Sequence, residues 1–341
     1  MQTNRCIVLE ERPRYIIPTA NCFRLDSKVP VPEPRTGEIL VRTMWLGMEP
    51  YLLGKVKRAS SESEPVALGA PMVGPAVGRV EHAAGGEYQP GDVVYGLWAW
   101  QDYAITPAVR TRRVPEGLRR PSHHLGALGY SGFGAYIAMN DLGAAKAGDT
   151  VLVGTASGGL GQIAGQIARI KGCRAVGIAG GAEKCALAVE RFGYDICVDH
   201  DQKDFAARLK SACGHGVDVY LETIGGHVLD AVVPLFNLRA RMVVCGLMAL
   251  YSGGTLPEGP DRTMVLLNQA IIKRLEIRGL SVFDHLKRRY NDFKREMVGW
   301  IESGDVKPLE DVIEGLENAP RALQDLFEGK NKGKSVVKVS D

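Results

Sequence analysis

The 341-residue sequence has no long uninterrupted apolar run. A membrane-spanning helix needs about 20 consecutive apolar residues, and the apolar segment from Val66 to Val80 is broken by repeated glycine and proline. The N-terminus carries Arg5, Glu10 and Arg12 around the short apolar run Ile7 to Leu9, which is far less than a secretory signal requires. We therefore expect a cytoplasmic protein with no membrane partner.

The sequence also lacks an excess of one charge and lacks paired cysteine motifs. Its formal net charge is +3 at pH 7, spread along the chain, which gives no electrostatic reason to expect a nucleic acid as partner. The seven cysteines are odd in number, widely spaced and without a C-x-x-C pair. We therefore expect reduced thiols rather than a disulfide framework.

Length and turn pattern predict two domains, because the chain is too long for one ordinary core. A mostly β N-terminal domain is indicated by short β-rich runs that alternate with glycine and proline turn signals. These runs are Cys6 to Leu9, Glu38 to Leu46, Val77 to Glu81, Val93 to Leu97 and Tyr103 to Ile105. A terminal strand-like run, Ser335 to Val339, is expected to pair with that domain.

From about Leu125 the pattern changes to strands that alternate with helices. The helical spacing covers Gln162 to Ile170, Glu183 to Phe192, Phe205 to Cys213 and later Tyr290 to Ser303. The expected buried strands are Thr150 to Val153, Arg174 to Ile178, Ile196 to Val198, Val217 to Leu221, Met242 to Cys245 and Leu275 to Val282. This α/β pattern predicts a doubly wound parallel (Rossmann) sheet over residues 127–304, with 1–126 and 305–341 forming the other domain.

A glycine-rich segment follows the first of these strands. Ala156-Ser157-Gly158-Gly159-Leu160-Gly161 lies between that strand and the helix from Gln162. This is the dinucleotide-binding pattern, with Ala156 in the first glycine position. Gly158 lets the backbone approach a pyrophosphate, and Gly161 lets the helix lie close to the strand. We favour a cofactor site over a plain tight turn because the motif sits within a βαβ unit.

The end of the next strand predicts which dinucleotide is bound. An NAD site usually places Asp or Glu there to bind the ribose, whereas this chain continues with Ala179, Gly180 and Gly181 before Glu183 and Lys184. An uncharged strand end followed by a lysine suits a 2′-phosphate, so NADP(H) is the expected cofactor. In the alternative interpretation Lys184 is an ordinary exposed lysine and Glu183 is the ribose-binding acid.

Several segments together resemble a known family. They are Pro30-Val-Pro-Glu-Pro34, Gly47-Met-Glu-Pro-Tyr51, Leu125 to Tyr136, the glycine-rich segment, Ile178 to Cys185, Ile224-Gly-Gly226 and Asn331-Lys-Gly-Lys334. The sequence is similar over nearly its whole length to the zinc-free medium-chain dehydrogenases/reductases of the prostaglandin reductase, leukotriene B4 12-hydroxydehydrogenase and curcumin reductase type. The resemblance implies a GroES-like N-terminal domain, a homodimer, and NADPH-dependent reduction of the C=C bond of α,β-unsaturated ketones and aldehydes.

The resemblance also implies roles for individual residues. Lys184 matches the lysine that binds the 2′-phosphate, and Asn331 a further cofactor contact. Tyr251 matches the tyrosine beside the nicotinamide, and Tyr51 an aromatic residue of the substrate cleft. The expected cofactor-binding residues are Ala156, Ser157, Gly158, Gly159, Leu160, Gly161, Gly180, Lys184, His200, Thr223, Cys245, Tyr251, Phe283 and Asn331; the expected substrate-lining residues are Tyr51, Trp45, Trp98 and Tyr130.

Several positions depart from the family pattern. His200 stands where a tyrosine is common, Glu222-Thr223 where Asp-Asn is common, Tyr130-Ser131 where Met is followed by Pro or Thr, and Gly134 where Thr is typical. Thr223, Ser131 and His200 keep polar groups, so cofactor binding is still expected. The departures concern the choice of substrate and the type of reaction.

No metal is expected, because the region that holds zinc ligands in related alcohol dehydrogenases reads Gly69-Ala-Pro-Met-Val-Gly-Pro-Ala-Val-Gly-Arg79. His123 and His124 have no partner cysteine and are expected to be surface or cleft residues. Hydrogen-bond donors must then stabilise the oxyanion that forms when an enone accepts a hydride. Tyr251 is the candidate catalytic donor, and a packing role is the alternative.

Other side chains leave alternatives open. Tyr51, Trp45, Trp98 and Trp100 either line a pocket for an apolar substrate or belong, in about half of the cases, to the core. Glu49 and Glu222 are general acids only if they are buried, and exposed carboxylates are the expectation. Quinones, imines or secondary-metabolite intermediates remain alternative substrates, and a non-catalytic NADPH-binding or RNA-binding protein is a further alternative.

Overall fold

The structure is a computed structural model. It divides into two compact units: unit 1 comprises Met1–Leu125 and Glu310–Asp341, and unit 2 comprises Gly126–Leu309. None of the helices in the described part of the chain combines the length and apolarity that a bilayer crossing needs. The described residues are 3–13, 17–57, 64–115, 120–253 and 262–341.

Unit 2 is built on a six-stranded parallel sheet in the order β10-β9-β8-β11-β12-β13. The order reverses between β8 and β11, which is the switch point where ligands bind in doubly wound folds. The predicted fold class is confirmed. The strands are β8 (Thr150–Val153), β9 (Arg174–Ala179), β10 (Ile196–Asp199), β11 (Val217–Glu222), β12 (Phe236–Val244) and β13 (Glu276–Gly279).

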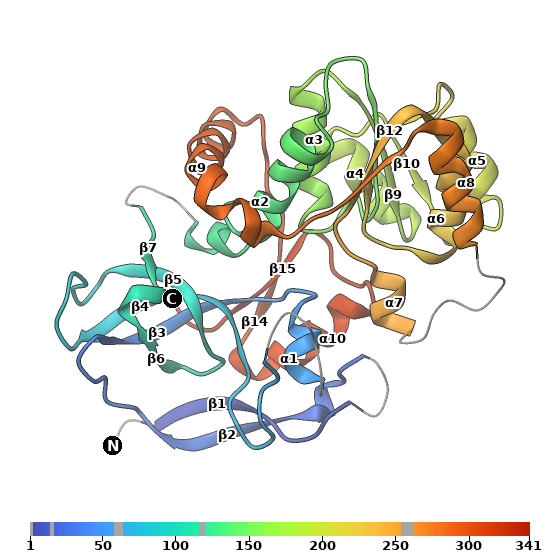
Figure 1. The fold of residues 1–341 in the computed structure, drawn as a ribbon. Coiled ribbons are helices and arrows are strands. Elements are labelled where there is room, and N and C mark those ends of the chain that lie inside the picture. The colour runs from blue at the N-terminus through green and yellow to red at the C-terminus, as the bar shows by residue number, and fades with distance from the viewer. Residues whose placement is uncertain (1–2, 14–16, 58–63, 116–119, 254–261) are drawn as a thin grey trace. The chain divides into compact units, whose positions relative to one another are not determined.

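Helices cover both faces of this sheet. On one face Phe205, Leu209 and Ala212 of α5 share a core with Leu152 and Val176 of the sheet, and Figure 1 draws α5, α6 and α8 beside one another. The spacing of these apolar side chains is that of an amphipathic helix. The helices are α2 (Tyr130–Ile137), α3 (Gly161–Ile170), α4 (Ala182–Phe192), α5 (Phe205–Ala212), α6 (Gly226–Val232), α7 (Met248–Gly253), α8 (Thr263–Lys273) and α9 (Leu286–Ser303).

Residues 305–309 cluster with unit 2, although the sequence placed them in the N-terminal domain. Two buried glutamines of α3 explain the difference. Gln162 exchanges two hydrogen bonds with the backbone of Leu309, from Nε2 to O at 2.9 Å and from N to Oε1 at 2.7 Å. Gln166 accepts a further bond from the amide of Lys307 at 2.7 Å. Side-chain partners of this kind leave no periodic pattern in the sequence.

Unit 1 is mostly β. A seven-stranded sheet has the order β14-β15-β3-β4-β5-β7, with β6 paired to β3, and β1 and β2 form a separate antiparallel pair. Its strands are β1 (Thr3–Leu9), β2 (Phe23–Pro30), β3 (Glu38–Gly47), β4 (Val73–Ala83), β5 (Val93–Ala99), β6 (Tyr103–Pro107), β7 (Arg112–Arg113), β14 (Glu310–Glu314) and β15 (Lys334–Lys338). Its helices are α1 (Leu52–Val56) and α10 (Ala319–Phe327).

The terminal strand pairs as expected, since β15 runs antiparallel to β3 and places Val337 opposite Leu46. Strand β14 pairs parallel with β15 and was not predicted. Its sequence, Glu-Asp-Val-Ile-Glu, is acidic and leaves most side chains partly exposed, so it carries little hydrophobic signal. The predicted strand Leu275 to Val282 is shortened to β13, because Val282–His285 forms a 3₁₀ turn.

Candidate functional site

The glycine-rich segment joins β8 to α3 at the carboxyl edge of the unit 2 sheet. The amide of Gly158 donates to the carbonyl of Thr155 at 2.8 Å, and the amide of Gln162 donates to the carbonyl of Gly158 at 3.0 Å. These bonds close the turn and start the helix. The residue that precedes α3, Leu160, offers no side-chain cap, so no side chain of that residue offsets the positive end of the helix dipole at this turn.

Two glycines in this region have no room for a side chain. A Cβ atom on Gly161 would lie 2.2 Å from the backbone oxygen of Thr155, and one on Gly154 would lie 2.5 Å from the hydroxyl of Thr223. Ala156 is fully buried and its amide donates to the carbonyl of Ile178 at 2.8 Å. The loop is therefore held against both β9 and the end of β11.

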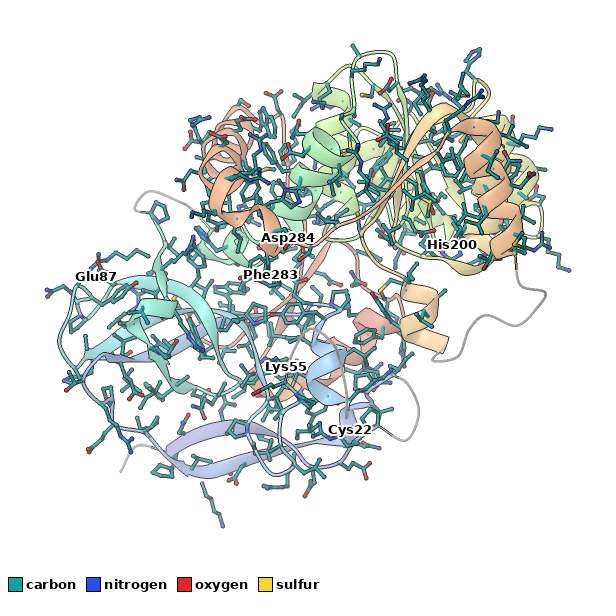
Figure 2. All side chains as sticks on the ribbon, viewed as in Figure 1. Cys22, Lys55, Glu87, His200, Phe283 and Asp284 are labelled. Atoms are coloured by element: carbon teal, nitrogen blue, oxygen red, sulfur yellow. The ribbon has the colours of Figure 1, made fainter. Side chains whose placement is uncertain are left out.

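Gly180 and Gly181 end β9 without a charged side chain, and Lys184 lies in the first turn of α4. A Cβ atom on Gly180 would lie 3.3 Å from Nε2 of His200, so the structure brings His200 over the turn between β9 and α4. Figure 2 labels His200 and Phe283, which follow β10 and β13 at the carboxyl edge of the sheet. The carboxylate of Asp201 lies at the same turn, with its Oδ2 3.2 Å from that Cβ position on Gly180.

A buried acid at the end of β10 is directed toward the backbone of this turn. Asp199, at the end of β10, accepts bonds from the amides of Gly181 at 2.8 Å and Asp201 at 3.0 Å, and from the side chain of Gln202 at 2.9 Å. Burial opposes ionisation, but these donors outweigh it and lower the pKa of Asp199. Its carboxylate therefore serves the backbone of the turn rather than a ribose hydroxyl.

His200 is partly buried, and its Nδ1 lies 3.3 Å from Oδ1 of Asp201. Burial lowers the pKa of His200 below its ordinary value, and the neighbouring His227 acts in the same direction, while Asp201 opposes them. The ring centroids of the two histidines are 5.7 Å apart. Near neutral pH His200 is therefore a neutral hydrogen-bonding group.

The loop after β12 folds back over the end of β11. The amide of Cys245 donates to the carbonyl of Glu222 at 2.8 Å, and the amide of Met248 donates to the carbonyl of Thr223 at 3.0 Å. The hydroxyls of Thr223 and Thr155 lie 3.0 Å apart. Thr223 and Cys245 are thereby held beside the glycine-rich loop, with Tyr251 in the short helix α7 that follows.

Glu222 is completely buried, contrary to the expectation of an exposed carboxylate. Its Oε1 accepts hydrogen bonds from the amides of Ile224 at 2.6 Å and Gly225 at 2.9 Å. Burial raises the pKa of Glu222, although these amide donors oppose the shift. Glu222 thus holds the turn between β11 and α6 through hydrogen bonds to its backbone. This role was not predicted, because the sequence does not show which residues are buried.

Tyr130 and Phe283 meet in unit 2. Their rings pack edge to face with centroids 5.5 Å apart, and Phe283 remains 64% exposed. A Cβ atom on Gly134 would meet Leu160 at 3.4 Å and Val282 at 3.5 Å. Helix α2, the glycine-rich loop and the turn after β13 therefore converge. Tyr130, expected to line the substrate site, thus lies in the same region as Leu160 and Phe283, which are expected to bind the cofactor.

Four expected site residues belong to unit 1. The side-chain amide of Asn331 donates to the carbonyl of Gly333 at 2.8 Å. Trp98 is 2% exposed and donates from Nε1 to the hydroxyl of Thr43 at 3.1 Å, so the core interpretation holds for it, as it does for the fully buried Trp100. Trp45 and Tyr51 are partly exposed.

The loop that carries Tyr51 is anchored by a buried ion pair. Lys334 of β15 lies 2.7 Å from Oε1 of Glu49, and both side chains are about nine-tenths or more buried. Lys334 also donates to the carbonyl of Met48. The sequence expected Glu49 to be exposed; the structure instead places it under the C-terminal strand, where it fixes the turn before Tyr51.

Metal-binding geometry is absent from the described residues, where no group of three or more His, Cys, Asp or Glu side chains could hold an ion. His124 is buried and its ring stacks on that of Tyr95 with centroids 4.3 Å apart. Burial lowers the pKa of the adjacent His123 to about 4. His124 is therefore a packing group of unit 1 rather than the expected surface or cleft residue, and His123 is partly exposed.

Together these features define a nucleotide-binding α/β unit attached to a β unit, the architecture of a two-domain oxidoreductase. The family model described as N-terminal domain of oxidoreductase matches residues 5–114, and the family model described as zinc-binding dehydrogenase matches residues 159–303. The NADPH-dependent curcumin reductase of Escherichia coli is 42% identical over 99% of this chain and 98% of its own. The NADP(+)-dependent 2-alkenal reductase of Nicotiana tabacum is 35% identical over 92% and 90%.

A solved structure, that of CurA from Vibrio vulnificus in complex with NADPH, superimposes with a TM-score of 0.94 and 42% identity, covering 99% of both chains. The chain belongs to the medium-chain dehydrogenase/reductase family, in the group that contains the curcumin and alkenal reductases. The resemblance inferred from the sequence motifs is thereby confirmed.

The close contact at Gly161 yields a stability prediction. Gly161→Ala places a methyl group 2.2 Å from the backbone of Thr155, and such overpacking costs about 1–3 kcal/mol. Gly299→Ala in α9 is the matched control, because nothing lies within 4 Å of its Cβ position and alanine favours a helix by about 0.5–1 kcal/mol. Urea unfolding followed by circular dichroism measures both; equal stability of Gly161→Ala and wild type would contradict the contact.

Proposed function

We propose that this protein uses NADPH to reduce the activated C=C bond of an α,β-unsaturated aldehyde or ketone. Two features at the carboxyl edge of the sheet support the cofactor part of the proposal. One is the N-terminus of α3, which has no side-chain cap, and the other is the β9–α4 turn, where the carboxylate of Asp199 is bound by the backbone. The names of the relatives, a curcumin reductase and a 2-alkenal reductase, support the substrate class.

The residues divide the binding task. The amides that begin α3 receive the pyrophosphate, and Gly158 gives them close access. Lys184 holds the 2′-phosphate by a charge-assisted hydrogen bond, and His200 adds a neutral hydrogen-bonding partner on the other side of Gly180. Thr223, Cys245 and Phe283 border the place of the nicotinamide. NADPH, when bound, supplies the hydride.

Tyr251 stabilises charge that develops on the substrate. As the β-carbon of an enone gains a hydride, negative charge builds on the carbonyl oxygen, and a phenol that donates a hydrogen bond there lowers the barrier. A water molecule then delivers the proton to the α-carbon.

Several further assignments stay predictions. They are the substrate-lining roles of Tyr51, Trp45 and Tyr130, the cofactor contact of Asn331 and the cytoplasmic location. To distinguish the substrate classes, the protein is tested with enals, enones, quinones and cyclic imines. The decrease in NADPH absorbance measures the reaction with each.

Lys184→Ala tests the cofactor assignment. Loss of a charge-assisted hydrogen bond costs about 1.5–3 kcal/mol, so we expect KM for NADPH to rise about 10-fold to 100-fold. KM for NADH should stay unchanged, because NADH carries no 2′-phosphate. Lys210→Ala, which removes an exposed lysine from α5, is the control and should leave both values unaltered. A wild-type protein that does not prefer NADPH to NADH would refute the assignment.

Tyr251→Phe tests the donor. The substitution removes only the hydroxyl, so we expect kcat/KM on a good 2-alkenal to fall about 100-fold while the Kd for NADPH stays within about twofold. Stopped-flow or steady-state absorbance measures the rate, and fluorescence titration measures cofactor affinity. An unchanged kcat/KM would show that Tyr251 is a packing residue.

We also propose that two copies of unit 2 associate through β13 and α8. Strand β13 ends the described sheet on one side and all its residues are exposed, so its outer edge can pair with another strand. No residue of helix α8 is fully buried within one chain, although Leu266 packs against the core of unit 2. The exposed apolar residues of this surface are Met264, Val265, Leu267, Ile271, Ile272 and Ile277. A second copy of the chain, which offers the same apolar face, is the proposed occupant.

Ile271→Asp tests this association. Ile271 is 77% exposed in the single chain, and a charge in the middle of an apolar interface is costly when it is buried without a partner. We expect multi-angle light scattering to give a dimer for wild type and a monomer for the variant. Val109→Asp, at a residue of unit 1 that is 93% exposed, should remain dimeric. A monomeric wild type would contradict the proposal.

A further inference from the structure

Two cysteines that are distant in sequence meet beside the β9–α4 turn. Cys185 lies in the first turns of α4, and Cys197 lies in β10. The thiol of Cys197 donates to the sulfur of Cys185, with the two Sγ atoms 3.1 Å apart. A disulfide bond is about 2.0 Å long, so bond formation requires the sulfurs to approach by only about 1 Å. The sequence offered no sign of this pair.

The two sulfurs can be reached from solvent. Both side chains are partly exposed, and they line a surface cavity of about 310 Å³ together with Ala182, Asp199, Gln202 and Arg208. A small oxidant fits such a space. None of the residues that line this cavity belongs to the glycine-rich loop. The two cysteines are therefore not part of the proposed hydride-transfer chemistry.

The two thiols differ in chemical character. The hydrogen bond from Cys197 lowers the pKa of Cys185, with a smaller contribution from the charge of Arg208, and these effects outweigh burial and the charge of Asp199. The same hydrogen bond and burial raise the pKa of Cys197. The helix N-terminus also favours a negative sulfur at Cys185. Cys185 is thus the nucleophile of the pair, and Cys197 is the resolving thiol.

Other thiols of unit 2 are in a different environment. Cys173 and Cys213 are buried, and burial raises the pKa of each to about 11. Burial likewise raises the pKa of Cys245 to about 12. Because the thiolate is the reactive form, oxidation within unit 2 should be confined to the pair.

We propose that Cys185 and Cys197 form a modification site at which hydroperoxides close a disulfide between α4 and β10. The Cys185 thiolate attacks one peroxide oxygen, the O–O bond breaks, and the leaving oxygen takes up a proton as an alcohol or water. The Cys197 sulfur then attacks the sulfenic sulfur of Cys185, which forms the S–S bond and releases water. Two thiols are oxidised and one hydroperoxide is reduced. This inference does not depend on the proposed function.

The full-length protein allows a direct test. Trypsin cuts after Lys184, Arg191 and Lys203, so the two cysteines fall on separate peptides, 185–191 and 192–203. Reduced protein is treated with one equivalent of hydrogen peroxide, its remaining thiols are alkylated, and the digest is analysed without reductant. We expect loss of two thiols and a linked pair of these peptides, which separates when dithiothreitol is added.

Variants of single cysteines show which thiol of the pair reacts first with the peroxide. Cys197→Ser should leave Cys185 as a sulfenic acid that dimedone labels, whereas Cys185→Ser should give neither label nor bridge. Cys173→Ser is the control and should form the linked peptides like wild type. Recovery of both wild-type peptides as alkylated thiols after the peroxide is consumed, or a link to a different cysteine, would overturn the proposal. The wild-type digest decides this even if a variant fails to fold.

Discussion

The close approach of α3 to β8 is the constraint on which the rest of unit 2 depends. Gly161 can begin the helix only because it has no Cβ atom, since the carbonyl of Thr155 occupies that space. The approach directs the helix N-terminus at the carboxyl edge of the sheet and brings Leu160 against α2 and the turn after β13. A bulkier residue would separate helix and strand and would disperse the groups that now converge.

Hydrogen bonding to the backbone determines which charges a ligand meets. Asp199 and Glu222 both lie at strand ends on this edge, and both direct carboxylate oxygens at amides of the following turn. They shape the turns at β10 and β11 without offering free negative charge to a phosphate. This arrangement leaves the β9–α4 turn with His200 beside Gly180 and with Lys184 in the first turn of α4.

Much of this architecture could be predicted because it rests on local pattern. Strand β8 and helices α3 to α5 follow apolar periodicity, and the glycine-rich segment has a fixed order of residues. The roles of Glu49, Glu222 and Gln162 could not be predicted, because each depends on a partner far along the chain or on burial. Strand β14 escaped notice since its acidic sequence resembles a loop, and it becomes a strand only beside β15.

The sequence alone therefore determined the order of elements, the position of the glycine-rich turn and the family, since these depend on neighbouring residues and on motif spacing. The tertiary structure decided which polar side chains are available to a ligand or reagent. It buried Glu222 and Trp98, turned Asp199 inward, and brought Cys185 within 3.1 Å of Cys197. The physical reason is that burial and hydrogen bonding are set by residues that fold together from distant parts of the chain.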